Sequence, residues 1–126
     1  MYSKEIEESI AKLVQYRDIV KLFLSYVKDV HSTSKTKQVT FMTRKVLHYA
    51  DKKFGLGQNW RKFSSRLMLI LRFLADLGIV KRVGIGKYMI DRDSPLWDII
   101  KHEDVETMFR ELLTVCLQRA SEIHKS

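Results

Sequence analysis

The sequence predicts a mainly α-helical fold with a small β-hairpin, an α+β class, and three observations support this. Apolar residues recur every three or four positions through most of the chain, as in amphipathic helices. After one long apolar stripe, Gly78 leads into two short β-rich segments around a Gly-Ile-Gly turn. The length of 126 residues, with 45% hydrophobic and 30% charged residues, fits one globular domain. We therefore expect a single domain over 1–126, with a core at about 16–92 and flanking helices at about 2–30 and 95–124.

The N-terminal part predicts one long helix over residues 2–30. Its apolar residues follow a four-three spacing, with Arg17 filling the gap in the series Ile6, Ile10, Leu13, Val20, Leu24 and Val27. The second half carries a further apolar stripe at Ile19, Phe23, Tyr26 and Val30. A helix with two apolar faces needs two partners. We expect one face to pack on its own domain and the other to meet a second subunit, the alternative being that both pack within one chain.

A short strand and a second helix are predicted next. Residues 31–37 form a polar linker, and residues 38–42 alternate and contain β-forming residues. Thr40 or Thr43 is expected to cap the helix that follows. Gly55 is expected to end that helix, with Leu56 making the hydrophobic contact typical of such an end. The inner face of this helix is predicted to hold Val46, Leu47, Ala50 and Phe54.

The third helix is predicted from an N-cap at Asn59 to Leu77, and Gly78 ends it. Phe73 lies at the edge of an inner stripe made of Trp60, Phe63, Leu67, Ile70, Leu71, Leu74 and Leu77. The outer face holds Arg61, Ser65, Met68, Leu69, Arg72 and Asp76. Segments 79–83 and 87–91 then form the hairpin across Gly84-Ile85-Gly86.

The C-terminal part predicts two more helices. Ser94 followed by Pro95 is an N-cap with proline at the first helical position, ahead of an apolar cluster at Leu96, Trp97, Ile99 and Ile100. A final amphipathic helix starts at Asp104 and carries Val105, Met108, Phe109, Leu112, Cys116, Ala120 and Ile123. We expect the terminal helices to supply a homodimer interface, with Ile6, Ile10, Leu13, Val20, Met108, Leu112, Cys116 and Ile123 as its residues.

Positive charge is concentrated in the middle of the chain. Residues 35–92 hold fourteen Lys and Arg and three Asp, a net charge of +11, although the whole chain has a net charge of +8. Residues 1–34 have no net charge, and residues 93–126 sum to −3. A polyanion is therefore the first partner to consider for residues 35–92.

Three segments carry a resemblance to a known superfamily. They are RKVLHYADKKFG in the second helix, NWRKFSSRLMLILRFLADLG in the third helix and IVKRVGIGKYMID in the hairpin. With the order helix, strand, helix, turn, helix, hairpin, residues 16–92 resemble the winged helix-turn-helix superfamily of small prokaryotic-type transcriptional regulators. The run LADLGIVKRVGIGKYMI is the most specific part, and it indicates a fold without naming a single family. The resemblance implies that the N-terminal part of the third helix, the recognition helix, enters the major groove of double-stranded DNA.

Two cations at the start of this recognition helix strengthen that expectation. Arg61 and Lys62 occupy the first turn, where the helix dipole favours acidic residues, and a phosphate would cancel the cost. Solvated surface cations are the alternative interpretation. Ser64 and Ser65 extend the same surface, and Arg66 can reach guanine as a bidentate donor. Because Met68 and Leu69 make the middle of the outer face apolar, we expect contact over the first two turns only.

The resemblance also implies that the hairpin, the wing, lies along the DNA backbone or in the minor groove. The alternative is that its cations only protect a sheet edge from aggregation. The DNA-binding residues predicted in full are Asn59, Arg61, Lys62, Ser64, Ser65, Arg66, Lys81, Arg82, Lys87 and Arg92. Further backbone contacts are considered at Lys35, Lys37, Arg44 and Lys45.

No catalytic or metal-binding pattern is expected. The four histidines at 31, 48, 102 and 124 lack the ligand spacing of a zinc site, and Gly84–Lys87 lacks the spacing of a Walker phosphate loop. Cys116 falls on an apolar stripe and is interpreted as a core residue. We expect no enzyme activity, cofactor, metal or evident small-molecule ligand. No apolar run reaches membrane-span length and the N-terminus is polar, so a cytoplasmic, nucleoid-associated location without membrane contact is expected.

The resulting hypothesis is a sequence-specific or semi-specific double-stranded DNA-binding protein that acts as a homodimeric transcriptional regulator. Two alternatives stay open. One is a winged-helix protein–protein interaction module in a larger assembly, with the basic face against an acidic protein. The other is a nonspecific chromatin or nucleoid protein, which uses the same phosphate contacts with little base readout.

Overall fold

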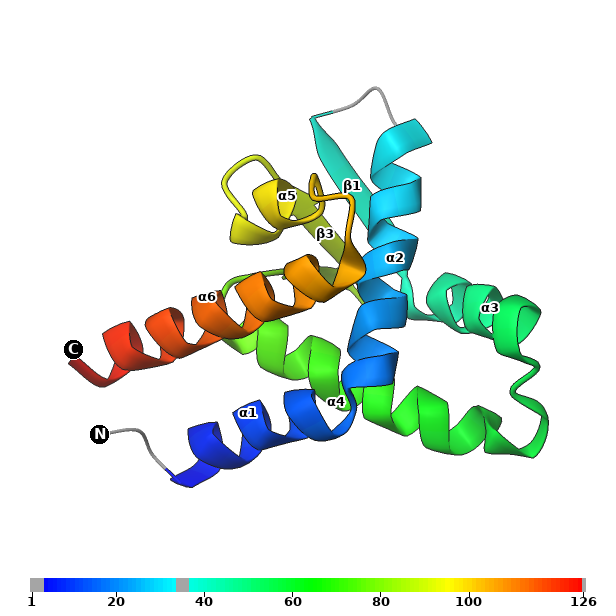
Figure 1. Cartoon of the computed structure of the whole chain (residues 1–126), viewed down its shortest axis with the longest axis horizontal. Coiled ribbons are helices and arrows are strands. Elements are labelled where there is room, and N and C mark those ends of the chain that lie inside the picture. Colours follow the sequence, from blue (N-terminus) through cyan, green and yellow to red (C-terminus); the bar gives the residue numbers. More distant parts are fainter. Residues whose placement is uncertain (1–3, 34–36, 126) are drawn as a thin grey trace.

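The fold is mainly helical with a small three-stranded antiparallel sheet (Figure 1), which confirms the predicted α+β class. The predicted strand at 38–42 pairs with the hairpin and adds the third strand. A computed structural model describes residues 4–33 and 37–125. Its helices and strands are α1 (Lys4–Gln15), α2 (Arg17–Thr33), β1 (Gln38–Met42), α3 (Thr43–Phe54), the 3₁₀ turn η1 (Gly57–Asn59), α4 (Trp60–Asp76), β2 (Lys81–Gly84), β3 (Lys87–Asp91), α5 (Pro95–Ile99) and α6 (Val105–Lys125).

The prediction of one long N-terminal helix is wrong. The helix breaks at Tyr16, and α1 and α2 then run in different directions (Figure 1). The amide of Ile19 bonds to the carbonyl of Tyr16 at 2.9 Å, an i to i+3 bond that marks a tight turn. Arg17, which interrupts the apolar stripe, is the first residue of α2. Because of the turn, α1 packs on both α4 and α6 of its own chain, which buries Leu13.

Helix α2 is the centre of the molecule. It contacts α6, α3, α4 and β1, so both of its apolar faces are covered within one chain (Figure 1). The predicted dimer interface is therefore wrong for Leu13, Val20, Met108, Leu112 and Cys116, which are at most 1% exposed. Ile6 and Ile10 are half-buried against the same core. The side chain of Ile123 lies outside the described part of the chain.

The sheet has the strand order β1-β3-β2, with β3 in the middle. Val39 pairs with Ile90, and Lys81 pairs with Met89. Strand β2 begins at Lys81 rather than at the predicted residue 79. The amides of Ile79 and Val80 bond instead to the carbonyl of Leu74, so they complete the end of α4 and are not available to the ladder.

The turn of the hairpin is hydrogen-bonded to the start of α3. Neither Thr40 nor Thr43 caps this helix with its side chain, contrary to the prediction. The amide and the hydroxyl of Thr43 both donate to the carbonyl of Gly86, at 2.9 and 3.3 Å. The turn between β2 and β3 is thereby fixed against α3.

The predicted ends of the two central helices are largely confirmed. Gly55 and Gly78 have φ angles of 60° and 73°, in the left-handed region that glycine adopts without steric strain. Helix α4 ends at Asp76, one residue before the prediction, and Asn59 stands at its N-cap position without a side-chain bond to the backbone. Phe54 was predicted on the inner face of α3, but its side chain is 69% exposed.

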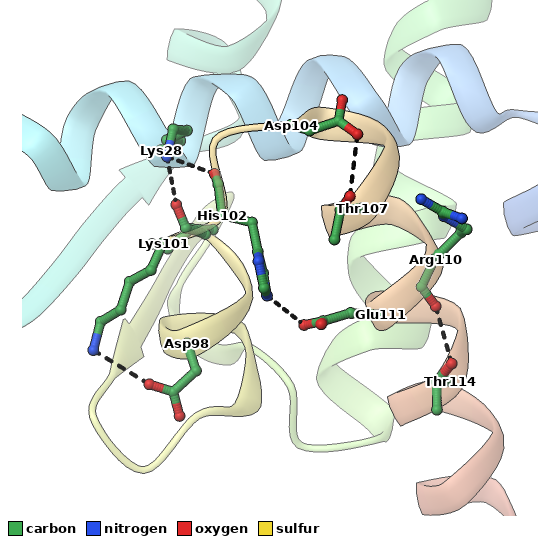
Figure 2. A network of polar contacts seen from close by, with 10 residues as sticks. Lys28, Asp98, Lys101, His102, Asp104, Thr107, Arg110, Glu111 and Thr114 are labelled. Atoms are coloured by element: carbon green, nitrogen blue, oxygen red, sulfur yellow. Dashed lines mark hydrogen bonds and ion pairs between the residues drawn. The ribbon is translucent and has the colours of Figure 1, made fainter.

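Polar contacts tie the C-terminal helices to α2 at a site that we call the α5–α6 junction, residues 94–111 together with Lys28 (Figure 2). The Lys28 ammonium donates to the carbonyls of Ile100 at 3.0 Å and His102 at 2.7 Å. His102 Nε2 lies 2.9 Å from Glu111 Oε2. Asp104 accepts from the amide of Glu106 at 3.2 Å and thus caps α6. Its pKa is lowered, chiefly by this bond.

The predicted start of α5 is confirmed. The hydroxyl of Ser94 accepts from the amide of Leu96 and donates to the carbonyl of Ile79, so one buried side chain links α5 to the segment after α4. Pro95 stands at the first helical position. Among the helices that the structure describes, none combines the length and the apolar character needed to cross a membrane.

Candidate functional site

A groove runs between the outer side of α4, the start of α3 and the hairpin. We call it the α4–hairpin groove. Its volume is about 910 Å³, and its lining residues are Met42, Thr43, Arg44, Leu47, Trp60, Met68, Arg72, Ala75, Asp76, Gly78, Val80, Lys81, Arg82, Ile85, Gly86 and Tyr88. Four of these residues are cations and one is a carboxylate, so the groove favours an anionic partner.

Met68 and Arg72 on the α4 wall of this groove belong to a stripe of exposed side chains that continues beyond the groove. Arg61, Ser65, Met68 and Arg72 follow a four-three-four spacing, which places them on one side of a helix with 3.6 residues per turn. No hydrogen bond or ion pair with another described residue engages the head groups of Arg61 and Arg72. The first turn of α4 contains no acidic residue. These two arginines are therefore free to bind an external anion.

Trp60 stands at the rim of the same wall. Its side chain is 36% exposed, and its ring centre lies 6.1 Å from that of His48. The predicted place of Trp60 on the inner stripe is wrong, because its side chain is exposed and lines the groove. Its ring instead adds an apolar face to the groove.

The hairpin wall carries two cations that already have partners. Lys81 donates to Asp91 at 2.9 Å, and this contact raises the pKa of Lys81 and lowers that of Asp91. The Nε of Arg82 donates to the carbonyl of Gly84 at 3.4 Å, beside the irregularity in the β2–β3 pairing. Ile85 forms the tip and is 94% exposed.

The structure divides the predicted DNA-binding residues among three places. Arg61, Ser65, Lys81 and Arg82 lie at the α4–hairpin groove or on its outer stripe. Asn59, Lys62 and Arg66 line a different groove on the other side of α4. The remaining three are the half-buried Ser64, the exposed Lys87 beside the turn, and Arg92 at the opposite end of β3.

Arg66 is the clearest departure from the predicted guanine contact. Its guanidinium carbon lies 4.7 Å from the centre of the Tyr16 ring, at the break between α1 and α2. A cation over an aromatic ring is an attractive contact within the chain. This contact could not be predicted from the sequence, because Tyr16 was expected inside a continuous helix.

Two groove residues, Arg44 and Arg72, were absent from the predicted set of contacts. Arg72 shares the outer stripe with Arg61, so the helical spacing alone was sufficient to include it. Arg44 was considered only as an additional backbone contact, together with Lys37 and Lys45, which are both exposed outside the groove. Lys35 lies outside the described residues.

The second groove, the α2–α4 groove, has a volume of about 710 Å³. It lies between α2, the end of α3 and the start of α4. Its lining residues are Asp18, Ile19, Lys21, Leu22, Ser25, Tyr49, Lys53, Phe54, Leu56, Asn59, Lys62, Phe63 and Arg66. Successive residues of the same α4 turns therefore face two different grooves.

The described residues contain no group of three or more His, Cys, Asp or Glu side chains that could hold a metal ion. Cys116 is buried in the core, and burial raises the pKa of its thiol to about 12. This thiol therefore stays protonated and is a poor nucleophile at neutral pH.

No family model, curated protein or solved structure matches this chain. The two grooves and their charges are therefore the basis for any functional assignment.

Proposed function

We propose that this chain is a winged-helix protein that binds double-stranded DNA with the α4–hairpin groove and the outer stripe of α4. The observation that carries the proposal is the pair of unengaged arginines, Arg61 and Arg72, on one stripe beside a basic hairpin. An α-helix fits the major groove of B-DNA, whose width is about 12 Å. In this arrangement α4 is the recognition helix, and the hairpin cations reach the flanking phosphates.

The fold supports this arrangement in two ways. The helix α2, strand β1, helices α3 and α4, and the hairpin follow one another in the order expected of a winged helix-turn-helix. The two bonds from Thr43 to Gly86 fix the hairpin turn relative to α3 and α4. A fixed hairpin loses less conformational entropy when it binds a phosphate backbone.

We also propose that two copies act together, because one small domain contacts few phosphates. Such a pair has to use residues other than those buried in the core. Val14 on α1 and Leu117 on α6 are 43% and 40% exposed, and α1 packs beside α6. This α1–α6 side is where the interface is expected.

The test is fluorescence anisotropy with random and genomic duplexes across a salt series. We expect log affinity to fall linearly with log salt, by about 0.9 per phosphate contacted. The double variant Arg61→Gln/Arg72→Gln should reduce that slope by about 1.8, since two contacts are lost. The stoichiometry at saturation reports whether two copies bind each site.

The matched control is Arg17→Gln/Arg110→Gln, which removes two exposed arginines away from the groove and should leave the slope unchanged. Absence of duplex binding at low salt would overturn the proposal and favour an acidic protein partner. Equal affinity for random and genomic duplexes would instead indicate a nonspecific packaging role.

A further inference from the structure

We propose that the α2–α4 groove binds an amphiphilic organic anion, that is, a carboxylate on an apolar chain, and that this ligand weakens DNA binding. The first part depends only on the groove. The second part rests on the proposed function. Both parts start from the residues that the fold brings together from α2, α3 and α4.

The floor of the α2–α4 groove is apolar. Ile19 and Leu22 of α2 line the floor and are only 7% and 6% exposed, and the half-buried Leu56 and Phe63 lie beside them. Phe54 stands at the edge with 69% of its side chain exposed. Burial of apolar surface contributes about 25 cal/mol per Å², so a chain laid along this floor and against Phe54 is stabilised.

The rim of the groove is cationic. Lys21, Lys53, Lys62 and Arg66 line it, against one carboxylate, Asp18. Lys21 is paired with Glu106, and Arg66 lies over Tyr16. Lys62 makes no hydrogen bond or ion pair with another described residue. Its ammonium is therefore the expected partner of a ligand carboxylate, and a ligand with a cationic head is disfavoured by the same rim.

The size of the groove favours a small molecule. Its volume of about 710 Å³ lies within the range of about 300–1,000 Å³ that is usual for small-molecule sites. An α-helix with side chains is about 10 Å across, so the groove has room for only its first turns. A ligand with one head group and a flexible apolar chain matches the single cationic rim and the continuous floor.

The same turns of α4 serve both grooves, which links the two binding events. Lys62 and Arg66 face the α2–α4 groove, and Arg61 and Ser65 are the residues directly before them on the outer stripe. A carboxylate held by Lys62 places negative charge next to the proposed phosphate contact of Arg61. Each ligand then lowers the affinity of the other by the same factor.

Isothermal titration calorimetry tests the site with three probes below their micelle concentrations. Decanoate has the proposed chemistry, decyltrimethylammonium has a ten-carbon chain with the opposite charge, and butyrate has the same charge with a short chain. We expect decanoate to bind at least about tenfold more tightly than either of the other two, because a charge-assisted bond and a buried chain are each worth that much.

Variants locate the site. Lys62→Gln and Phe54→Ser should each weaken decanoate binding by about tenfold, and both residues are exposed, so the fold is retained. The controls are Lys45→Gln and Ile85→Ser, which make the same changes outside this groove and should leave decanoate binding unchanged. Equal binding of decanoate and decyltrimethylammonium, absence of saturable binding, or equal losses in the controls would each overturn the site.

The link to DNA is measured separately, by anisotropy with saturating decanoate. A drop of about threefold or more in duplex affinity that disappears in Lys62→Gln supports the coupling. Unchanged duplex affinity overturns the coupling and leaves the site in place. Decanoate binding by a chain that does not bind DNA would contradict the proposed function alone, so the two failures are distinguishable.

Discussion

The α4–hairpin groove and the α5–α6 junction use their basic side chains in opposite ways. At the junction, Lys28 and Lys101 donate to oxygens of the same chain, and His102 pairs with Glu111 (Figure 2). In the groove, the head groups of Arg44 and Arg72 have no partner among the described residues. The basic composition of a segment is therefore not sufficient to identify a binding surface. On the proposed function, the cations without an internal partner are the ones that bind DNA.

Burial explains why the two regions differ. The junction joins α2 to the end of α5, where the last carbonyls of a helix lack partners in the helix itself. Lys28 is partly buried there and satisfies the carbonyl of Ile100, the C-cap residue of α5, and that of His102 in the loop beyond it. Arg44 and Arg72 of the groove are exposed, and water solvates them at little cost, so the fold does not need to pair them.

The largest loss of stability is expected from a substitution of Lys28. The substitution Lys28→Met keeps the length of the side chain and removes its donors from the carbonyls of Ile100 and His102. We expect a loss of about 1–3 kcal/mol in the free energy of unfolding, because two partly buried acceptors lose their partner. Urea unfolding followed by circular dichroism measures this change. A loss below about 0.5 kcal/mol would mean that water replaces the ammonium, and would remove the contrast between the two regions.

An arginine-to-methionine substitution in the groove should leave stability nearly unchanged and alter duplex binding instead. Arg72→Met should change the free energy of unfolding by less than about 0.5 kcal/mol, since the side chain is exposed and unpaired. The salt dependence of duplex binding should weaken, with a log–log slope lower by about 0.9. Destabilisation as large as that of Lys28→Met would show that Arg72 is structural and would contradict its place in the interface.

The smallest effect is expected from Lys81 and Asp91, because this groove cation, like Arg82, already has a partner within the chain. The hydrogen bond from Lys81 lowers the pKa of Asp91 below its ordinary value of 3.8. The resulting stabilisation is present above that value and is lost as the pH falls through the lower folded-state pKa. In Asp91→Asn, the drop in the urea midpoint between pH 6 and pH 3 should be slightly smaller than in the parent chain. An equal drop in both proteins would show that the pair is solvated and contributes nothing.

Several parts of the fold could be predicted because they depend on local chemistry. Strand β1, the hairpin, the helix ends at Gly55 and Gly78 and the cap at Ser94 all follow from residues within a few positions of one another. The outer stripe of α4 also followed from helical spacing alone. It could not be predicted from the sequence that Lys62 and Arg66 face a different groove from Arg61, because this depends on where α2 and the hairpin lie.

Short-range patterns in the sequence were sufficient to predict the α+β class, most element boundaries and the concentration of positive charge in the central segment. The break at Tyr16, the burial of both faces of α2 within one chain and the place of Arg66 over Tyr16 depend on how the helices pack. The packing also decides which cations are paired. Lys28 meets the carbonyl of Ile100 across 72 positions of the chain, and contacts between such distant residues exist only once the helices have packed.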